Sequence, residues 1–145
     1  MPEEVISRKK IFFLFLAGGT IVATTFVVGL VFGVATWTSW WIANFLHLIG
    51  GAYAFYFTRA IFYYTRPYHK TSAAPWMETI FFVAGAIVLG VWWEWYELAI
   101  DRYHVLVLGE RSIMTYADNI GDLVIDALGA AAAALYEYKK YAKRK

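Results

Sequence analysis

The sequence predicts an all-α protein, a bundle of four transmembrane helices. Two observations carry this prediction: 61% of the 145 residues are hydrophobic and 20% are aromatic, and the apolar residues gather into four long stretches. A chain of this composition has too little polar surface to cover a soluble globule. The expected class is therefore a single-domain, multi-pass integral protein of the cell membrane, in contact with the lipid bilayer.

The four predicted spans cover residues 11–33, 38–64, 76–100 and 117–138. Each is long enough for the roughly 20 helical residues that cross about 30 Å of hydrocarbon. The first follows the basic cluster Arg8-Lys9-Lys10, as in a signal peptide, but its spanning length and lack of a clean cleavage signal favour a retained helix. Trp40 and Trp41, near the start of the second span, and Trp76, at the start of the third, fit the aromatic belts of a membrane interface.

Basic residues predict the orientation. They concentrate in the two chain ends and in the loop between the second and third spans, whereas Arg102 and Arg111 are the basic residues of the opposite side. By the positive-inside rule, both termini are expected in the cytoplasm and the segment 101–116 outside. The chain has no extended basic patch for nucleic acid. Because it has no cysteine, thiolate metal sites, disulfides and cysteine nucleophiles are excluded.

Polar and acidic residues interrupt the last three spans, where charge is costly and usually functional. Residues of each set are three or four positions apart, so each set lies on one face of its helix. All are expected in the outer half of the membrane. The candidates are Asn44, His47, Glu94, Glu97, Asp118, Asp122 and Asp126.

Such an acidic cluster needs a neutralising partner. A divalent metal ion suits several carboxylates with one imidazole, although Glu94 and Glu97 with a single intramembrane histidine do not match the ferritin-like pattern. Shared protons and an arginine are the alternatives. Arg59 is the one arginine within a span, but it lies toward the cytoplasmic end.

Each candidate also has a structural interpretation. Asp118 can cap the fourth helix, His47 can be a hydrogen-bonded packing residue, and Glu97 can reach the outer interface. The functional interpretation is stronger for Glu94, Asp122 and Asp126 together. It places His47 and the five acids around a divalent metal ion, with Asn44 as a further polar residue of the site.

Two motifs carry a family resemblance. The segment Trp93-Glu94-Trp95-Tyr96-Glu97 and the acidic, glycine-containing run of residues 116–130 resemble the signature of YjdF-like membrane proteins, and the second motif also resembles the VanZ-like family associated with glycopeptide resistance. The resemblance covers about the C-terminal 40% of the chain. It implies four helices and a shared polar site that includes Glu94, Glu97, Asp118, Asp122 and Asp126, and it implies no particular activity.

Three functions follow as hypotheses. The first is an outward-facing cation site that, in an enzyme, supports metal-assisted hydrolysis or transfer on a lipid or lipid-linked substrate, with Glu94 or Asp122 as the base. The second is a proton- or cation-coupled transport component, which with four spans would require an oligomer. The third is a structural subunit of a larger membrane complex, whose acids would meet basic residues of a partner.

Overall fold

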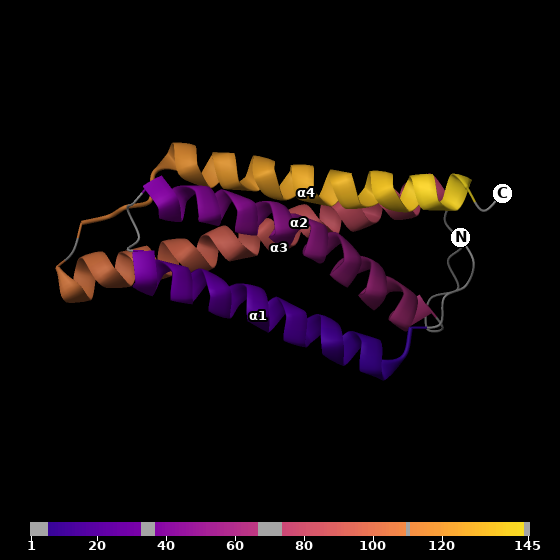
Figure 1. Cartoon of the computed structure of the whole chain (residues 1–145), viewed down its shortest axis with the longest axis horizontal. Coiled ribbons are helices and arrows are strands. Elements are labelled where there is room, and N and C mark those ends of the chain that lie inside the picture. Colours follow the sequence, from indigo (N-terminus) through magenta and orange to yellow (C-terminus); the bar gives the residue numbers. More distant parts are fainter. Residues whose placement is uncertain (1–5, 33–36, 67–73, 110, 144–145) are drawn as a thin grey trace.

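In the part of the chain that the structure describes, four α-helices run antiparallel to their neighbours in the sequence (Figure 1). The computed structural model describes residues 6–32, 37–66, 74–109 and 111–143, and within these ranges it contains helices and no strand. The helices run alternately up and down, so α1 begins and α4 ends at the same end of the bundle (Figure 1). The all-α, four-helix prediction is therefore confirmed for the described residues.

The helices are longer than the predicted spans. Their bounds are α1 (Arg8–Phe32), α2 (Trp37–Thr65), α3 (Pro75–Tyr103) and α4 (Tyr116–Ala142). Pro75 opens α3 at a position where the missing backbone donor costs nothing. Two segments, Pro75–Leu108 and Tyr116–Lys140, are long and apolar enough to cross a membrane, judged by length and composition.

The prediction of a loop over residues 101–116 is wrong for the first half of this segment. Helix α3 continues to Tyr103 and passes into a π-helical turn, η2 (His104–Leu108), which ends at Gly109 with a positive φ of 70°. Asp101 therefore lies on a helix. Its carboxylate accepts hydrogen bonds from the Ser112 hydroxyl at 2.7 Å and the Ile113 backbone N–H at 3.0 Å, and so holds the chain that leads into α4.

Helix α2 is the centre of the bundle, because it packs against α1, α3 and α4. Phe55 of α2 and Phe82 of α3 are its most deeply buried large side chains, and they pack edge to face with ring centroids 5.8 Å apart. Small residues of α4 such as Ala130 complete this core. Helix α1 is attached differently: within the described ranges its backbone comes close to that of α2 and not to those of α3 and α4.

Two glycines allow α2 and α4 to cross at very short distance. A Cβ atom on Gly51 would collide with the backbone carbonyl of Asp126, and one on Gly129 would collide with the backbone carbonyl of Leu48. Small residues at helix contacts are the usual means by which membrane helices approach closely. This crossing determines the position of Asp126 along the axis of α2.

A separate polar network joins the helices at the opposite end of the bundle. The Tyr63 hydroxyl donates to the buried Glu78 carboxylate at 2.7 Å, and Arg66 lies 4.0 Å from the same carboxylate. Arg59 pairs with Glu137 of α4 at 3.5 Å. Arg59 therefore forms its ion pair at the end of the bundle opposite the predicted acidic site, so it is not the counterion of those acids.

Candidate functional site

Helices α2 and α3 bring three predicted residues into one group. One ligand atom from each of His47, Glu94 and Glu97 lies within 4.8 Å of the other two. His47 and Glu94 are buried, whereas Glu97 is partly buried. Because Glu94 and Glu97 are three residues apart on α3, both carboxylates lie on the face toward α2.

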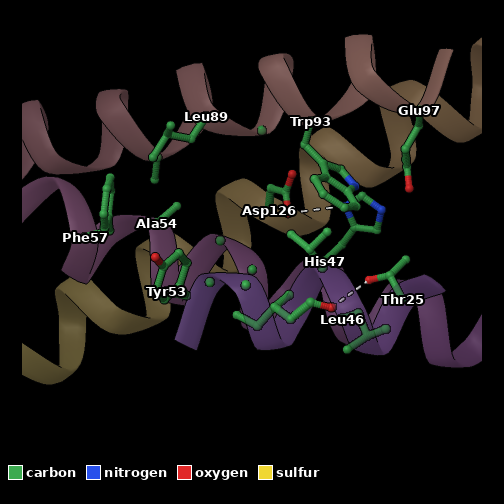
Figure 2. Close-up of a pocket in the computed structure, with 18 of the residues that line it drawn as sticks. Thr25, Leu46, His47, Tyr53, Ala54, Phe57, Leu89, Trp93, Glu97 and Asp126 are labelled. Carbon is green, nitrogen blue, oxygen red and sulfur yellow. Dashed lines mark hydrogen bonds and ion pairs between the residues drawn. The ribbon is translucent and has the colours of Figure 1, made fainter. Parts of the chain in front are cut away.

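Two acids of α4 flank the imidazole of His47. Asp126 lies 3.4 Å from Nδ1, and Asp122 lies 3.7 Å from Nε2. Figure 2 shows the side chains of His47, Trp93, Glu97 and Asp126 gathered at one end of a cavity, with the contact between His47 and Asp126 drawn as a dashed line. Three helices therefore contribute acids or imidazole to a single site.

Glycines provide the space in which Asp126 sits. A Cβ atom on Gly90 of α3 would lie 2.7 Å from the Asp126 carboxylate, which is too close, whereas one on Gly50 of α2 would lie at an ordinary contact distance of 3.8 Å. Gly50 and Gly51 follow His47 by three and four residues, and Gly90 precedes Glu94 by four, so each glycine shares a helix face with a site residue. This spacing of glycines and polar residues is the signal in the sequence that points to the relationship.

Glu94 is a buried acid that lacks a partner for its charge among the described hydrogen bonds. Both of its carboxylate oxygens are fully buried and have no hydrogen-bond partner within the described part of the chain, and the residue is 4% exposed. An ionised carboxylate without hydrogen bonds or a counterion is very costly to bury. The position therefore calls for a cation or a proton.

Two predicted residues lie apart from this group. The Asn44 side chain donates to the backbone carbonyl of Trp40 within its own helix, at 2.7 Å. Asp118 is exposed in the first turn of α4, where its carboxylate accepts from the Thr115 hydroxyl at 2.6 Å and its backbone N–H donates to that same hydroxyl. This is the geometry of a helix N-terminus stabilised by its own side chains.

The cavity beside the site has a volume of about 320 Å³. Its walls come mainly from α1, α2 and α3, and α4 contributes Asp126. Apolar and aromatic side chains such as Ala54, Phe57 and Leu89 line most of it, away from the polar end (Figure 2).

The comparison with protein families bears on where this site operates. A family described as a predicted membrane protein (DUF2238) matches residues 5–143, which is nearly the whole chain. The chain belongs to this DUF2238 family. The match confirms the expectation of a small membrane protein, although it carries neither the YjdF-like nor the VanZ-like name. No curated protein and no solved structure matches the chain.

Membership of a membrane-protein family changes the meaning of the buried acids. Helices α3 and α4 contain the two segments that are long and apolar enough to cross a membrane, and ionisable side chains in membrane-spanning segments usually face the bundle interior and mark a site. Glu94, Asp126 and His47 follow this rule, because all three point inward and are buried.

Proposed function

We propose that this DUF2238 protein binds a divalent cation at His47, Glu94 and Glu97, inside a bundle whose four helices all cross the membrane. The observation that supports the proposal most strongly is Glu94, a buried carboxylate whose two oxygens lack hydrogen-bond partners in the described part of the chain. A cation between Glu94, Glu97 and His47 would supply the missing partner.

The donor set suits a borderline or hard metal. One imidazole with carboxylates is typical of sites for zinc, manganese and iron. Ligand atoms lie about 2 Å from such an ion, so two of them are at most about 4 Å apart. The three candidate atoms lie within 4.8 Å of one another. Small side-chain rotations would therefore suffice to enclose an ion.

The two aspartates take supporting roles in this proposal. An imidazole that binds a metal commonly donates its other N–H to a carboxylate, which fixes the orientation of the ring. Asp126, at 3.4 Å from Nδ1, is suited to that role, and Nε2 is then directed to the ion. Asp122, at 3.7 Å from Nε2, is placed to bind the ion directly or to accept a proton beside it.

The same arrangement allows a reaction on a lipid or lipid-linked substrate. A bound divalent cation lowers the pKa of a coordinated water and polarises a carbonyl or phosphoryl oxygen. Glu94 or Asp122 would then take up the proton that the attacking water releases. The enzyme hypothesis is a hydrolase or transferase with these two residues as the candidate bases.

The proposed topology places both termini in the cytoplasm and the site in the outer half of the membrane. Helices α1 and α2, with 25 and 29 residues, have the length to cross a bilayer. Because the natural chain has no cysteine, single cysteines report its topology without background. A membrane-impermeant thiol reagent added to intact cells is expected to label Arg111→Cys and to leave Ser7→Cys unlabelled; labelling of Ser7→Cys alone would invert the orientation.

The test of the cation site is the metal content of purified protein. Wild type is expected to hold one divalent cation per chain, and Glu94→Gln and Glu97→Gln to lose it. Asp118→Asn is the matched control, since Asp118 is an acid of the same end of the bundle that caps α4. If purified wild type held no metal and Glu94→Gln were more stable than wild type, the cation site would be rejected. Proton-coupled transport or a partner subunit would then be the hypothesis to test.

A further inference from the structure

The cavity beside the proposed cation site carries its ionisable side chains at one end. It extends along α2 from His47 to Phe57, a helical rise of about 15 Å. Tyr53, Phe57 and Leu89 lie toward one end, and His47, Glu97 and Asp126 toward the other (Figure 2). This division matches a molecule with one apolar chain and one polar head.

The position of the cavity explains how such a molecule would reach it. Helices α1 and α3 both line the cavity, yet within the described ranges their backbones do not come close to each other. Gly18 and Gly19 form part of the α1 wall, and a Cβ atom on Gly19 would meet no atom within 4 Å. The cavity is also only partly enclosed. In a membrane, the space between α1 and α3 would face lipid.

The charges at the polar end restrict the head group. Among the described residues that line the cavity there are two carboxylates, Glu97 and Asp126, one imidazole, His47, and no lysine or arginine. A phosphate or carboxylate head would therefore meet two carboxylates, while the imidazole of His47 is already paired with Asp122 and Asp126. An uncharged hydroxyl can donate to a carboxylate and also offer a lone pair to a cation.

We propose that the cavity between α1, α2 and α3 binds one single-chain lipid with an uncharged hydroxyl head, a monoacylglycerol or a fatty alcohol, with the head at His47, Glu97 and Asp126. This inference rests on the proposed function, because the cation bound by Glu97 would hold the head oxygen. The volume of about 320 Å³ is at the lower end of the roughly 300–1,000 Å³ found for small-molecule sites, which favours one chain over two.

The experiment measures binding of tritiated monolaurin to the full chain in nanodiscs, with metal content determined on the same samples. Gly19→Leu adds a side chain to the α1 wall of the cavity, where a Cβ atom meets nothing within 4 Å, and it is expected to weaken monolaurin binding about tenfold or more, equivalent to at least about 1.4 kcal/mol. Gly121→Leu is the matched control: Gly121 lies on α4 outside the cavity, and a Cβ atom there also meets nothing within 4 Å. It should bind monolaurin as wild type does.

Competition identifies the head group. Dodecanol is expected to displace monolaurin, and dodecyl phosphate and dodecylamine to displace it poorly. The inference would be overturned if Gly19→Leu bound monolaurin as tightly as wild type, or if dodecyl phosphate or dodecylamine displaced monolaurin more strongly than dodecanol. If wild type held its cation but did not bind monolaurin, the lipid site would be overturned and the cation site would stand. If the purified protein held no cation, the proposed function itself would be rejected.

Discussion

The carboxylate of Asp126 on α4 lies 3.4 Å from Nδ1 of His47 on α2. This contact depends on the backbone, since Gly51 lets the two helices approach and Gly90 on α3 leaves room for the carboxylate. The histidine is thereby fixed between α4 and the acids of α3. The packing of three helices and the geometry of the candidate site are thus determined by the same small set of residues.

The first prediction concerns Asp126. Asp126→Asn keeps the shape of the side chain but removes the carboxylate that accepts from Nδ1 of His47. Loss of such an orienting carboxylate typically lowers metal affinity about 10–100-fold without abolishing binding. Titration of the metal-free protein with Zn²⁺ should show this intermediate loss. Affinity equal to that of wild type would remove Asp126 from the supporting role.

The second prediction concerns the crossing of α2 and α4. Gly51→Ala and Gly129→Ala each place a methyl group against a backbone carbonyl, so the helices must separate. Overpacking of this kind costs about 1–3 kcal/mol in free energy of unfolding. Denaturation in detergent measures it, with Gly19→Ala as the control because its new methyl group meets open space. Destabilisation by Gly19→Ala to the same extent would argue against the close crossing.

The third prediction concerns the polar network at the other end of the bundle. Tyr63→Phe removes the donor that satisfies the buried Glu78, and we expect a loss of about 1–3 kcal/mol in free energy of unfolding. Tyr64→Phe is the matched control on the next, exposed residue. The same unfolding assay compares the two variants. If Tyr63→Phe and Tyr64→Phe were equally stable, the hydrogen bond between Tyr63 and Glu78 would not contribute to the free energy of unfolding.

The fourth prediction concerns the connection between η2 and α4. Asp101→Ala removes the acceptor for Ser112 and Ile113, and the segment around them should become accessible to protease. Limited proteolysis with mapping of the cut sites checks this, and Arg102→Ala on the exposed neighbour serves as the control. Cleavage of the two variants at the same rate would contradict a role for Asp101 in holding this segment.

Helical spacing was sufficient to predict the core of the candidate site. Glu94 and Glu97 are separated by three residues, so a helix must place them on one face, and their depth in the third span matched that of His47 in the second. The four helices followed from hydropathy in the same way, because membrane-spanning length leaves few alternatives. These features depend on the local chain alone.

Features that depend on neighbouring helices could not be predicted in this way. Asp118 had the right spacing to Asp122, but it sits at the helix start, where the Thr115 hydroxyl engages it. Glu78 and Glu137 were overlooked because each lies near a span end, where acids are common, and their partners Tyr63 and Arg59 are on another helix. The end of α3 was placed too early because Asp101 and Arg102 interrupt the apolar run without ending the helix.

The central claim, a divalent cation at His47, Glu94 and Glu97, is tested most directly by anomalous scattering. Crystals of the full chain grown with Mn²⁺ would be measured at a wavelength where manganese scatters anomalously. A cation site at these residues predicts one strong peak per chain among the three side chains, which is absent from crystals of Glu94→Gln. A peak elsewhere in the bundle, or no peak in wild type that is otherwise well ordered, would contradict it.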